Sequence, residues 1–344
     1  MKKALAVLAV SVLALAGVLW TGARMRQQAA APRSPYADMV PGDVVRLHVA
    51  YLGDSVTLIR HAGNWVTARD RFPADTARLR RVLGHLLGMQ VKEEVSRAPS
   101  GHPDDLNLAA YDLDTASARR VTWTMADGRS VTVLLGKVSG IDYGSSFWKP
   151  AGSAVIYRTP HPFVYDVSSR SQDWKDTTLF PPFEASDIQA VSVAWRGEGG
   201  ARVHYTLERD TIRTEPATSG GRQRTEGFVW VGENGARRPA RREAASRVFD
   251  RAARFKVDEF VGGVDTAATA ARRASLDEPF MVIRITLRDG TRHAVVAGDV
   301  VHDLYRYVRH PRHPDPVRVF VWRFDDFRKR AAEFPVEDPV RERR

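Results

Sequence analysis

The sequence of 344 residues predicts an α+β protein. We expect two tandem, related units of mostly antiparallel sheet, each with one main helix, after an N-terminal transmembrane helix. Three observations carry this prediction. An uncharged apolar run opens the chain, alternating apolar and polar stretches fill much of the remainder, and two Asp-Gly turn signals recur 162 residues apart. At about 150 residues per domain, the chain length suits two units.

The apolar run from Ala4 to Ala23 lies between two lysines and two arginines. Its twenty residues would extend about 30 Å as a helix, which is the thickness of a bilayer's hydrocarbon core. We therefore expect residues 1–26 to form a signal anchor, with the body of the chain exported. A secretory signal peptide cleaved after Ala23 is the alternative, because small residues end the run. Residues 27–43 contain three prolines without periodicity and predict a linker.

The first α+β unit is expected over residues 44–188. A main helix is predicted after Pro73-Ala74-Asp75, because Asp75 suits a helix N-cap, apolar residues follow at 3/4 spacing, and Gly88 can end the helix. Asp127-Gly128 is typical of a two-residue hairpin turn. The predicted strands cover residues 45–51, 56–60, 65–68, 91–95, 121–125, 130–135 and 163–167.

The second unit is expected over residues 189–335 and repeats this order. Asp289-Gly290 corresponds to the first Asp-Gly pair, and Gly298 corresponds to Gly136, both at an offset of 162. The helical stripe runs from Ala245 to Ala253, and a further helix is predicted over residues 325–334. The predicted strands cover residues 203–207, 228–231, 255–261, 283–287, 293–297 and 320–322, and residues 336–344 form a basic tail.

An ordered set of motifs resembles the bacterial family known as domain of unknown function 4340. The motifs are Val56-Thr57-Leu58-Ile59-Arg60, Trp65, Pro73-Ala74-Asp75, Tyr111-Asp112-Leu113-Asp114, Asp127-Gly128 and Leu135-Gly136-Lys137. The resemblance covers most of residues 55–335, and Thr115 departs from it because a proline often follows the Leu-Asp pair. It implies an N-terminal hydrophobic segment, an association with gliding-motility-type ABC transporter components, and no established enzyme activity.

Composition excludes several classes of chemistry. The chain has no cysteine, which rules out disulfides, thiolate metal sites and a cysteine nucleophile. Neither Gly-x-Ser-x-Gly nor His-Glu-x-x-His occurs, so we expect no catalytic residues, no cofactor and no metal. The net charge of +11 suits contact with anionic surfaces, but no nucleic-acid motif with stacking aromatics is present, and we expect no nucleic-acid partner.

Two groups of residues are candidates for binding. The stretch from 139 to 153 is predicted to be a long loop for a partner or ligand, with Tyr143, Ser145, Phe147, Trp148 and Lys149 as its contact residues. A packed long loop with Trp148 buried is the simpler interpretation of this stretch. The second group precedes the second helix and would contact an anionic surface; it consists of Arg237, Arg238, Arg241 and Arg242. A solvated basic surface is the simpler interpretation of the second group.

The histidine-containing region from 302 to 313 offers a third, weaker candidate. His302, His310 and His313 lie near Asp303 and Asp315, and imidazoles with carboxylates can bind Zn²⁺. The prolines in this stretch favour a polar surface loop instead.

The sequence therefore predicts a non-enzymatic accessory protein of the bacterial inner membrane, with a single span and a periplasmic body. Its expected partner is a membrane protein, for which components of an ABC-transporter-type complex are the candidates. One alternative is an envelope hydrolase or ligand-binding enzyme that uses the 139–153 loop or the 302–313 region. A second alternative is an envelope module that binds polyanions through the arginine clusters.

Overall fold

A computed structural model describes residues 34–214, 223–261 and 275–329 of the chain. The chain divides into two compact units. Unit 1 holds the chain up to Arg69 together with Ala74–Trp174, and unit 2 holds Asp70–Pro73 together with the chain from Lys175 onward. The sequence placed the boundary after residue 188. The observed boundary lies earlier because Leu179, Phe180 and Ile188 are buried in the core of unit 2.

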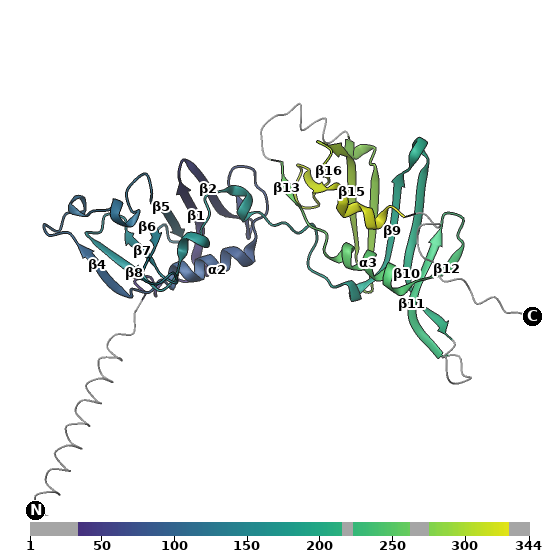
Figure 1. Ribbon diagram of the computed structural model, residues 1–344, viewed down its shortest axis with the longest axis horizontal. Helices are drawn as coiled ribbons and strands as arrows, with labels where there is room; N and C mark the ends of the chain where they lie inside the picture. Colours follow the sequence, from purple (N-terminus) through teal and green to yellow (C-terminus); the bar gives the residue numbers. More distant parts are fainter. Residues whose placement is uncertain (1–33, 215–222, 262–274, 330–344) are drawn as a thin grey trace, which may run out of the picture. The chain divides into compact units, whose positions relative to one another are not determined.

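Over its described residues, unit 1 is an eight-stranded antiparallel sheet with one α-helix (Figure 1). Its strand order is β3-β2-β1-β5-β6-β7-β8-β4. The apolar side of the helix packs on the alternate, inward-facing residues of the central strands, so one core lies between helix and sheet. The elements are β1 (Val44–Tyr51), β2 (Asp54–His61), β3 (Asn64–Thr67), α2 (Thr76–Leu87), β4 (Glu93–Arg97), β5 (Arg119–Met125), β6 (Ser130–Val138), β7 (Ser146–Pro150) and β8 (Val155–Thr159).

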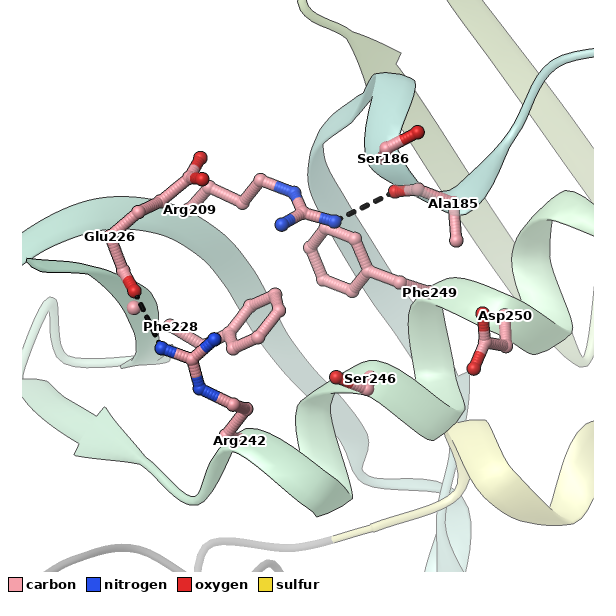
Figure 2. Close-up of a pocket in the computed structure, with 10 residues that line it drawn as sticks. Ala185, Ser186, Arg209, Glu226, Phe228, Arg242, Ser246, Phe249 and Asp250 are labelled. Carbon is pink, nitrogen blue, oxygen red and sulfur yellow. Dashed lines mark hydrogen bonds between the residues drawn. The ribbon is translucent and has the colours of Figure 1, made fainter.

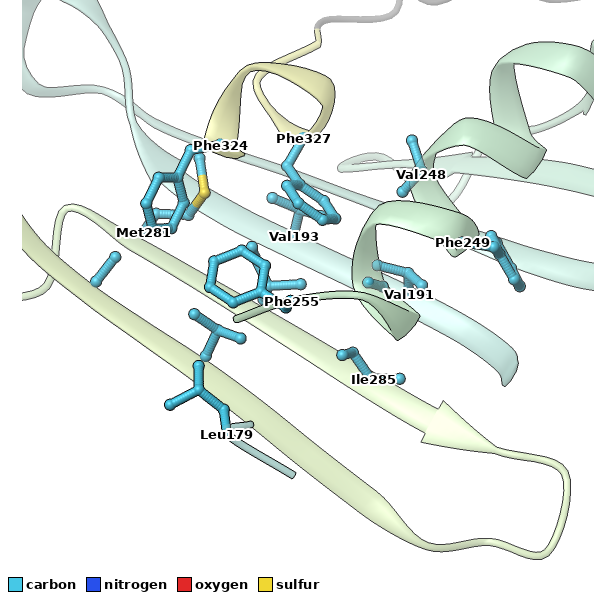
Figure 3. Packing of buried hydrophobic residues seen from close by; sticks show 14 of the residues in the cluster. Leu179, Val191, Val193, Val248, Phe249, Phe255, Met281, Ile285, Phe324 and Phe327 are labelled. Carbon is cyan, nitrogen blue, oxygen red and sulfur yellow. The ribbon is translucent and has the colours of Figure 1, made fainter. Parts of the chain in front are cut away.

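Unit 2 has a nine-stranded antiparallel sheet in the order β12-β11-β10-β9-β14-β15-β16-β17-β13. Val248 and Phe249 of its helix lie over Val191 and Val193 in the unit 2 core (Figure 3). The elements are β9 (Ile188–Arg196), β10 (Arg202–Thr214), β11 (Gln223–Gly232), β12 (Arg237–Ala240), α3 (Arg242–Ala253), β13 (Glu259–Phe260), β14 (Met281–Leu287), β15 (Arg292–Val301), β16 (Tyr305–Val308), β17 (Val317–Phe320) and the 3₁₀ helix η8 (Val321–Phe327).

The two sheets have the same strand order. When β9, β10 and β11 are equated with β1, β2 and β3, and β13–β17 with β4–β8, the orders coincide, and β12 is an extra strand at one edge of unit 2. Each unit also places a twelve-residue helix at the same point of the order. This agreement supports the internal repeat that the sequence predicts, and the α+β class is confirmed.

The two predicted Asp-Gly hairpins join β5 to β6 and β14 to β15. Gly128 and Gly290 have φ values of 89° and 87°, a conformation that glycine adopts without steric cost. In each turn the aspartate Oδ1 accepts a hydrogen bond from the backbone N–H two residues later, at 2.9 Å from Arg129 and 2.8 Å from Thr291. These backbone hydrogen bonds lower the pKa of both Asp127 and Asp289.

Gly136 and Gly298 also occupy equivalent places, in β6 and β15. A Cβ atom on Gly136 would lie 2.1 Å from the carbonyl oxygen of Tyr111, and one on Gly298 would lie 2.5 Å from Ser275 Oγ. In each unit, therefore, the segment that leads to the hairpin crosses closely over this glycine. A Cβ atom would clash at either position, which explains why glycine occurs at both.

The described end of the expected linker is packed against unit 1. Tyr36 is buried, its ring meets Trp123 edge-on at 5.1 Å, and Ser34 Oγ donates a hydrogen bond to the Leu87 carbonyl at 2.5 Å. The chain from Ser34 onward is thus part of the folded unit. The predicted signal anchor and the basic tail lie outside the described residues. Over residues 34–214, 223–261 and 275–329, no helix combines the length and hydrophobicity needed to cross a membrane.

Several predicted elements were wrong in type. The predicted strand 163–167 begins instead with a 3₁₀ helix, η4 (Phe163–Tyr165), because Pro160 and Pro162 remove backbone N–H donors just before it. Of the predicted strand 320–322, only Phe320 belongs to a strand, because β17 ends there and η8 starts at Val321. The predicted helix 325–334 overlaps only the end of this 3₁₀ helix, and its last residues lie outside the described part of the chain.

Candidate functional site

The predicted 139–153 loop contains strand β7, so its five candidate residues do not share one surface. Tyr143 is 81% exposed, whereas Ser145 and Trp148 are fully buried and Lys149 is nearly so. Trp148 points into the main core of unit 1, where its ring lies 5.3 Å from that of Tyr157. Phe147, the next residue in the strand, packs its ring against Tyr111 at 4.9 Å. Among the five, only Tyr143 is available at the tip.

The tip before β7 is held by ion pairs. Asp142 accepts a hydrogen bond from Lys92 at 2.7 Å and lies 3.5 Å from Arg158. The hydrogen bond from Lys92 is the main reason that the pKa of Asp142 is lowered. On either side of Asp142, Ile141 and Tyr143 are 87% and 81% exposed. The loop therefore presents two large apolar side chains on an anchored backbone.

The equivalent loop of unit 2 joins β15 to β16 and shares this feature. Val300 and Leu304 are among the exposed large apolar residues of the chain. His302 and Asp303 form the turn itself, with φ values of 51° and 57°. Both repeats thus expose apolar side chains at the same place in the topology.

The other histidines of the 302–313 region do not converge with His302. His310 is buried, its Nδ1 accepts the backbone N–H of Arg312 at 3.2 Å, and burial lowers its pKa to about 4. His313 uses Nε2 to donate to the carbonyl of Asp70 at 2.7 Å, and its ring stacks on Phe72 at 3.7 Å. Both side chains fasten the Asp70–Pro73 segment and the β16–β17 connection within unit 2.

The predicted arginine cluster lies on β12 and at the start of α3, and all four side chains are exposed. Arg237 is paired with Glu208 at 3.1 Å and with Asp210 at 2.8 Å, so its charge is locally balanced. Arg242 donates to the carbonyl of Glu226 at 2.9 Å. Arg238 and Arg241 complete the basic edge of unit 2.

Arg242 also borders a polar pocket of about 270 Å³ beside α3 (Figure 2). Arg209 lines the opposite side, where it donates to the carbonyls of Ile188 and Ala185 at 2.8 Å each and lies over the rings of Phe228 and Phe249. Burial lowers the pKa of Arg209. Glu226 and Asp250 also line the pocket, so two carboxylates balance the two guanidinium groups.

Unit 1 contains a cluster that the sequence did not predict. His85, in the last turn of α2, and His161, in the loop after β8, both hydrogen-bond the same oxygen of Asp166, at 2.8 Å and 2.6 Å. Their rings lie 4.3 Å apart. Burial favours a raised pKa for Asp166, but the hydrogen bonds from His161 and His85 outweigh it and lower the pKa. In the described part of the chain, this is the one group of three residues with the geometry of a metal-ligand set.

Sequence spacing offered little signal for this cluster. His85 lies 76 positions before His161, and neither residue belongs to a recognisable ligand motif. Only the short interval between His161 and Asp166 is local. The cluster forms because α2 ends next to the chain segment that follows β8.

Comparison with known proteins gives one match. The family model described as "Domain of unknown function (DUF4340)" matches residues 65–227. This match begins in β3 and ends in β11, which are equivalent strands of the two units, 162 positions apart. No match was found among the curated proteins or among the solved structures. The resemblance of this chain to the DUF4340 family is thereby confirmed over residues 65–227.

Proposed function

We propose that this chain is a membrane-anchored, non-enzymatic accessory protein of the bacterial inner membrane. Its N-terminal run of apolar residues holds it in the membrane, and its body faces the periplasm. There it binds a membrane-protein complex of the ABC-transporter type. The apolar run from Ala4 to Ala23 and the resemblance to the DUF4340 family support this proposal.

The observation that carries the binding function is the pair of equivalent loops with exposed apolar tips. We call them the tip loops: residues 139–145 in unit 1 and residues 300–304 in unit 2, the latter including the last two residues of β15. Soluble proteins seldom expose large apolar side chains in groups unless a partner covers them. Ile141 and Tyr143 are held out on a backbone fixed by Asp142, so little conformational entropy is lost when a partner covers them.

Repetition strengthens this interpretation. Val300 and Leu304 expose apolar surface in the second unit although the loop there has a different sequence and length. A chance surface residue would not be expected at the same topological place in both units. Tyrosine is also enriched in protein interfaces, because its ring buries much area and its hydroxyl tolerates water.

Affinity purification of the full chain from membranes in mild detergent tests the proposal. We expect an integral membrane partner to co-purify with the wild-type chain in fixed stoichiometry. A variant with serine at the four tip-loop positions 141, 143, 300 and 304 should lose the partner. Lys137→Ser changes an exposed polar residue of β6 and serves as the matched control.

Two results would contradict the proposal. Recovery of the wild-type chain only as an isolated monomer would show that it binds no membrane partner. Retention of the partner by the four-serine variant would show that the tip loops are not its binding surface.

A further inference from the structure

We propose that His85, His161 and Asp166 bind a divalent transition-metal ion of the Zn²⁺ type in unit 1. The sequence alone predicts no metal, and this site is independent of the proposed partner-binding function. The ligand atoms of the three side chains all lie within 4.8 Å of one another. They come from three different elements, namely the end of α2, the loop after β8 and the residue that follows η4.

The donor set fits this class of ion. Two imidazole nitrogens and one carboxylate oxygen are a recurrent ligand set of Zn²⁺ sites that keep a fourth position open. Imidazole disfavours Mg²⁺ and Ca²⁺, which prefer oxygen ligands. Ligand atoms around a tetrahedral Zn²⁺ ion lie about 3.3 Å apart, so the Asp166 oxygen needs to withdraw by about 0.5 Å from His85 Nδ1 and about 0.7 Å from His161 Nε2.

The backbone of the cluster is held in place by neighbouring polar groups. Ser146 Oγ donates to the carbonyl of His161 at 2.6 Å, and Arg78 Nη2 donates to the carbonyl of Asp166 at 3.2 Å. Such support keeps ligand side chains close to a productive geometry before the ion arrives. His85 is fixed in turn by its place in the α2 helix.

An ion can reach the cluster. The side chains of His85, His161 and Asp166 are 39%, 30% and 26% exposed. A pocket of about 170 Å³ opens beside them, lined by both histidines together with Gly84, Gly88 and Phe163 among others. This space accommodates a water molecule or another small ligand at the fourth coordination position.

The residue of unit 2 that is equivalent to His85 illustrates a purely structural contact. Arg251 is the tenth residue of α3, as His85 is the tenth residue of α2, and it pairs with Asp326 of η8 at 2.9 Å. One arginine therefore suffices to tie the helix to the segment after the last central strand. Unit 1 instead brings two imidazoles to one carboxylate oxygen, which is more than a simple tether requires and which places three potential ligand atoms within reach of one metal ion.

Metal binding to the purified full chain tests this inference. The protein is prepared in detergent without a polyhistidine tag, stripped with a chelator, and titrated with ZnCl₂ by equilibrium dialysis. We expect one Zn²⁺ per chain and no comparable uptake of Mg²⁺. His161→Ala should weaken Zn²⁺ binding by roughly 100-fold, because losing a residue that merely orients a ligand already costs roughly 10- to 100-fold.

His85→Arg is the decisive variant, because it rebuilds the arginine–aspartate pair that unit 2 already uses. It should fold with wild-type thermal stability in the absence of zinc, yet bind no stoichiometric Zn²⁺ and gain no stability from it. His102→Ala removes an exposed histidine elsewhere in unit 1 and should bind zinc as the wild type does. Full zinc occupancy in His85→Arg, or no saturable zinc in the wild-type chain, would overturn the inference.

Discussion

Replacing Gly136 with alanine tests the close crossing that both repeats share. The added Cβ would lie 2.1 Å from the carbonyl oxygen of Tyr111 and 3.0 Å from Leu113 Cγ. A relaxed carbon–oxygen contact is near 3.4 Å, so backbone must move by about 1 Å, and overpacking of this kind costs about 1–3 kcal/mol. We expect a loss near 3 kcal/mol, because the obstructing atom belongs to the main chain and Leu113 is fully buried.

Urea unfolding of the full chain in detergent, followed by near-ultraviolet circular dichroism, measures this loss. With a slope of about 2 kcal/mol per molar urea, a loss of about 3 kcal/mol lowers the midpoint of unit 1 by about 1.5 M. Gly298→Ala should cost less, about 1–2 kcal/mol. Its closest obstacle is the Ser275 hydroxyl, which can rotate away, and the nearest backbone oxygen, that of Ser275, lies at 2.9 Å, farther than the 2.1 Å at Gly136.

Gly140→Ala is the matched control, since a Cβ there meets no atom within 4 Å. Its free energy of unfolding should stay within about 0.5 kcal/mol of the wild-type value. Unfolding of Gly136→Ala at the same urea concentration as this control would refute the close crossing at Gly136.

Three further predictions concern stability. Asp75 accepts a hydrogen bond from the Arg78 N–H at the start of α2, so Asp75→Ala should cost about 1 kcal/mol in urea unfolding; an unchanged midpoint would contradict this. Trp148→Ala should cost about 3–5 kcal/mol and abolish much of the near-ultraviolet signal, whereas a surface role for Trp148 predicts almost no loss. Burial lowers the pKa of His310 to about 4 in the folded chain. As pH falls from about 6.5, this histidine is therefore protonated in the unfolded chain before it is protonated in the folded one. Unit 2 should therefore lose up to about 3 kcal/mol between pH 6.5 and pH 4 through His310, and His310→Asn should flatten that part of the profile. Parallel profiles for the two proteins would refute this role.

Local sequence signals predicted the elements that depend on near neighbours. The Asp-Gly pairs predicted two hairpins because glycine supplies the positive φ and aspartate caps the turn through its own backbone neighbours. Asp75 and Gly88 predicted the two ends of α2, and the structure has both. These signals act over a few residues, so the tertiary structure does not override them.

Strands β7 and β8 were missed because they are covered on both faces. A second apolar cluster, which includes Leu106 and Leu113, packs on the face of the sheet opposite α2 and buries Ile156. Alternation between apolar and polar residues is therefore lost in these strands. Strand β9 does alternate, so the sequence held the signal for it although it was not predicted.

The sequence by itself determined the apolar run at residues 4–23, the hairpin turns, the two helices and the repeat. The first three follow from local residue patterns, and the repeat follows from the constant spacing of 162 residues between equivalent motifs. Tertiary structure alone decided which residues form the candidate sites. It buried Trp148, left Tyr143 exposed beside Ile141, and brought His85 to His161 and Asp166. Side chains 76 positions apart meet only when the sheet order places the end of α2 beside the segment after β8, and no local pattern encodes that proximity.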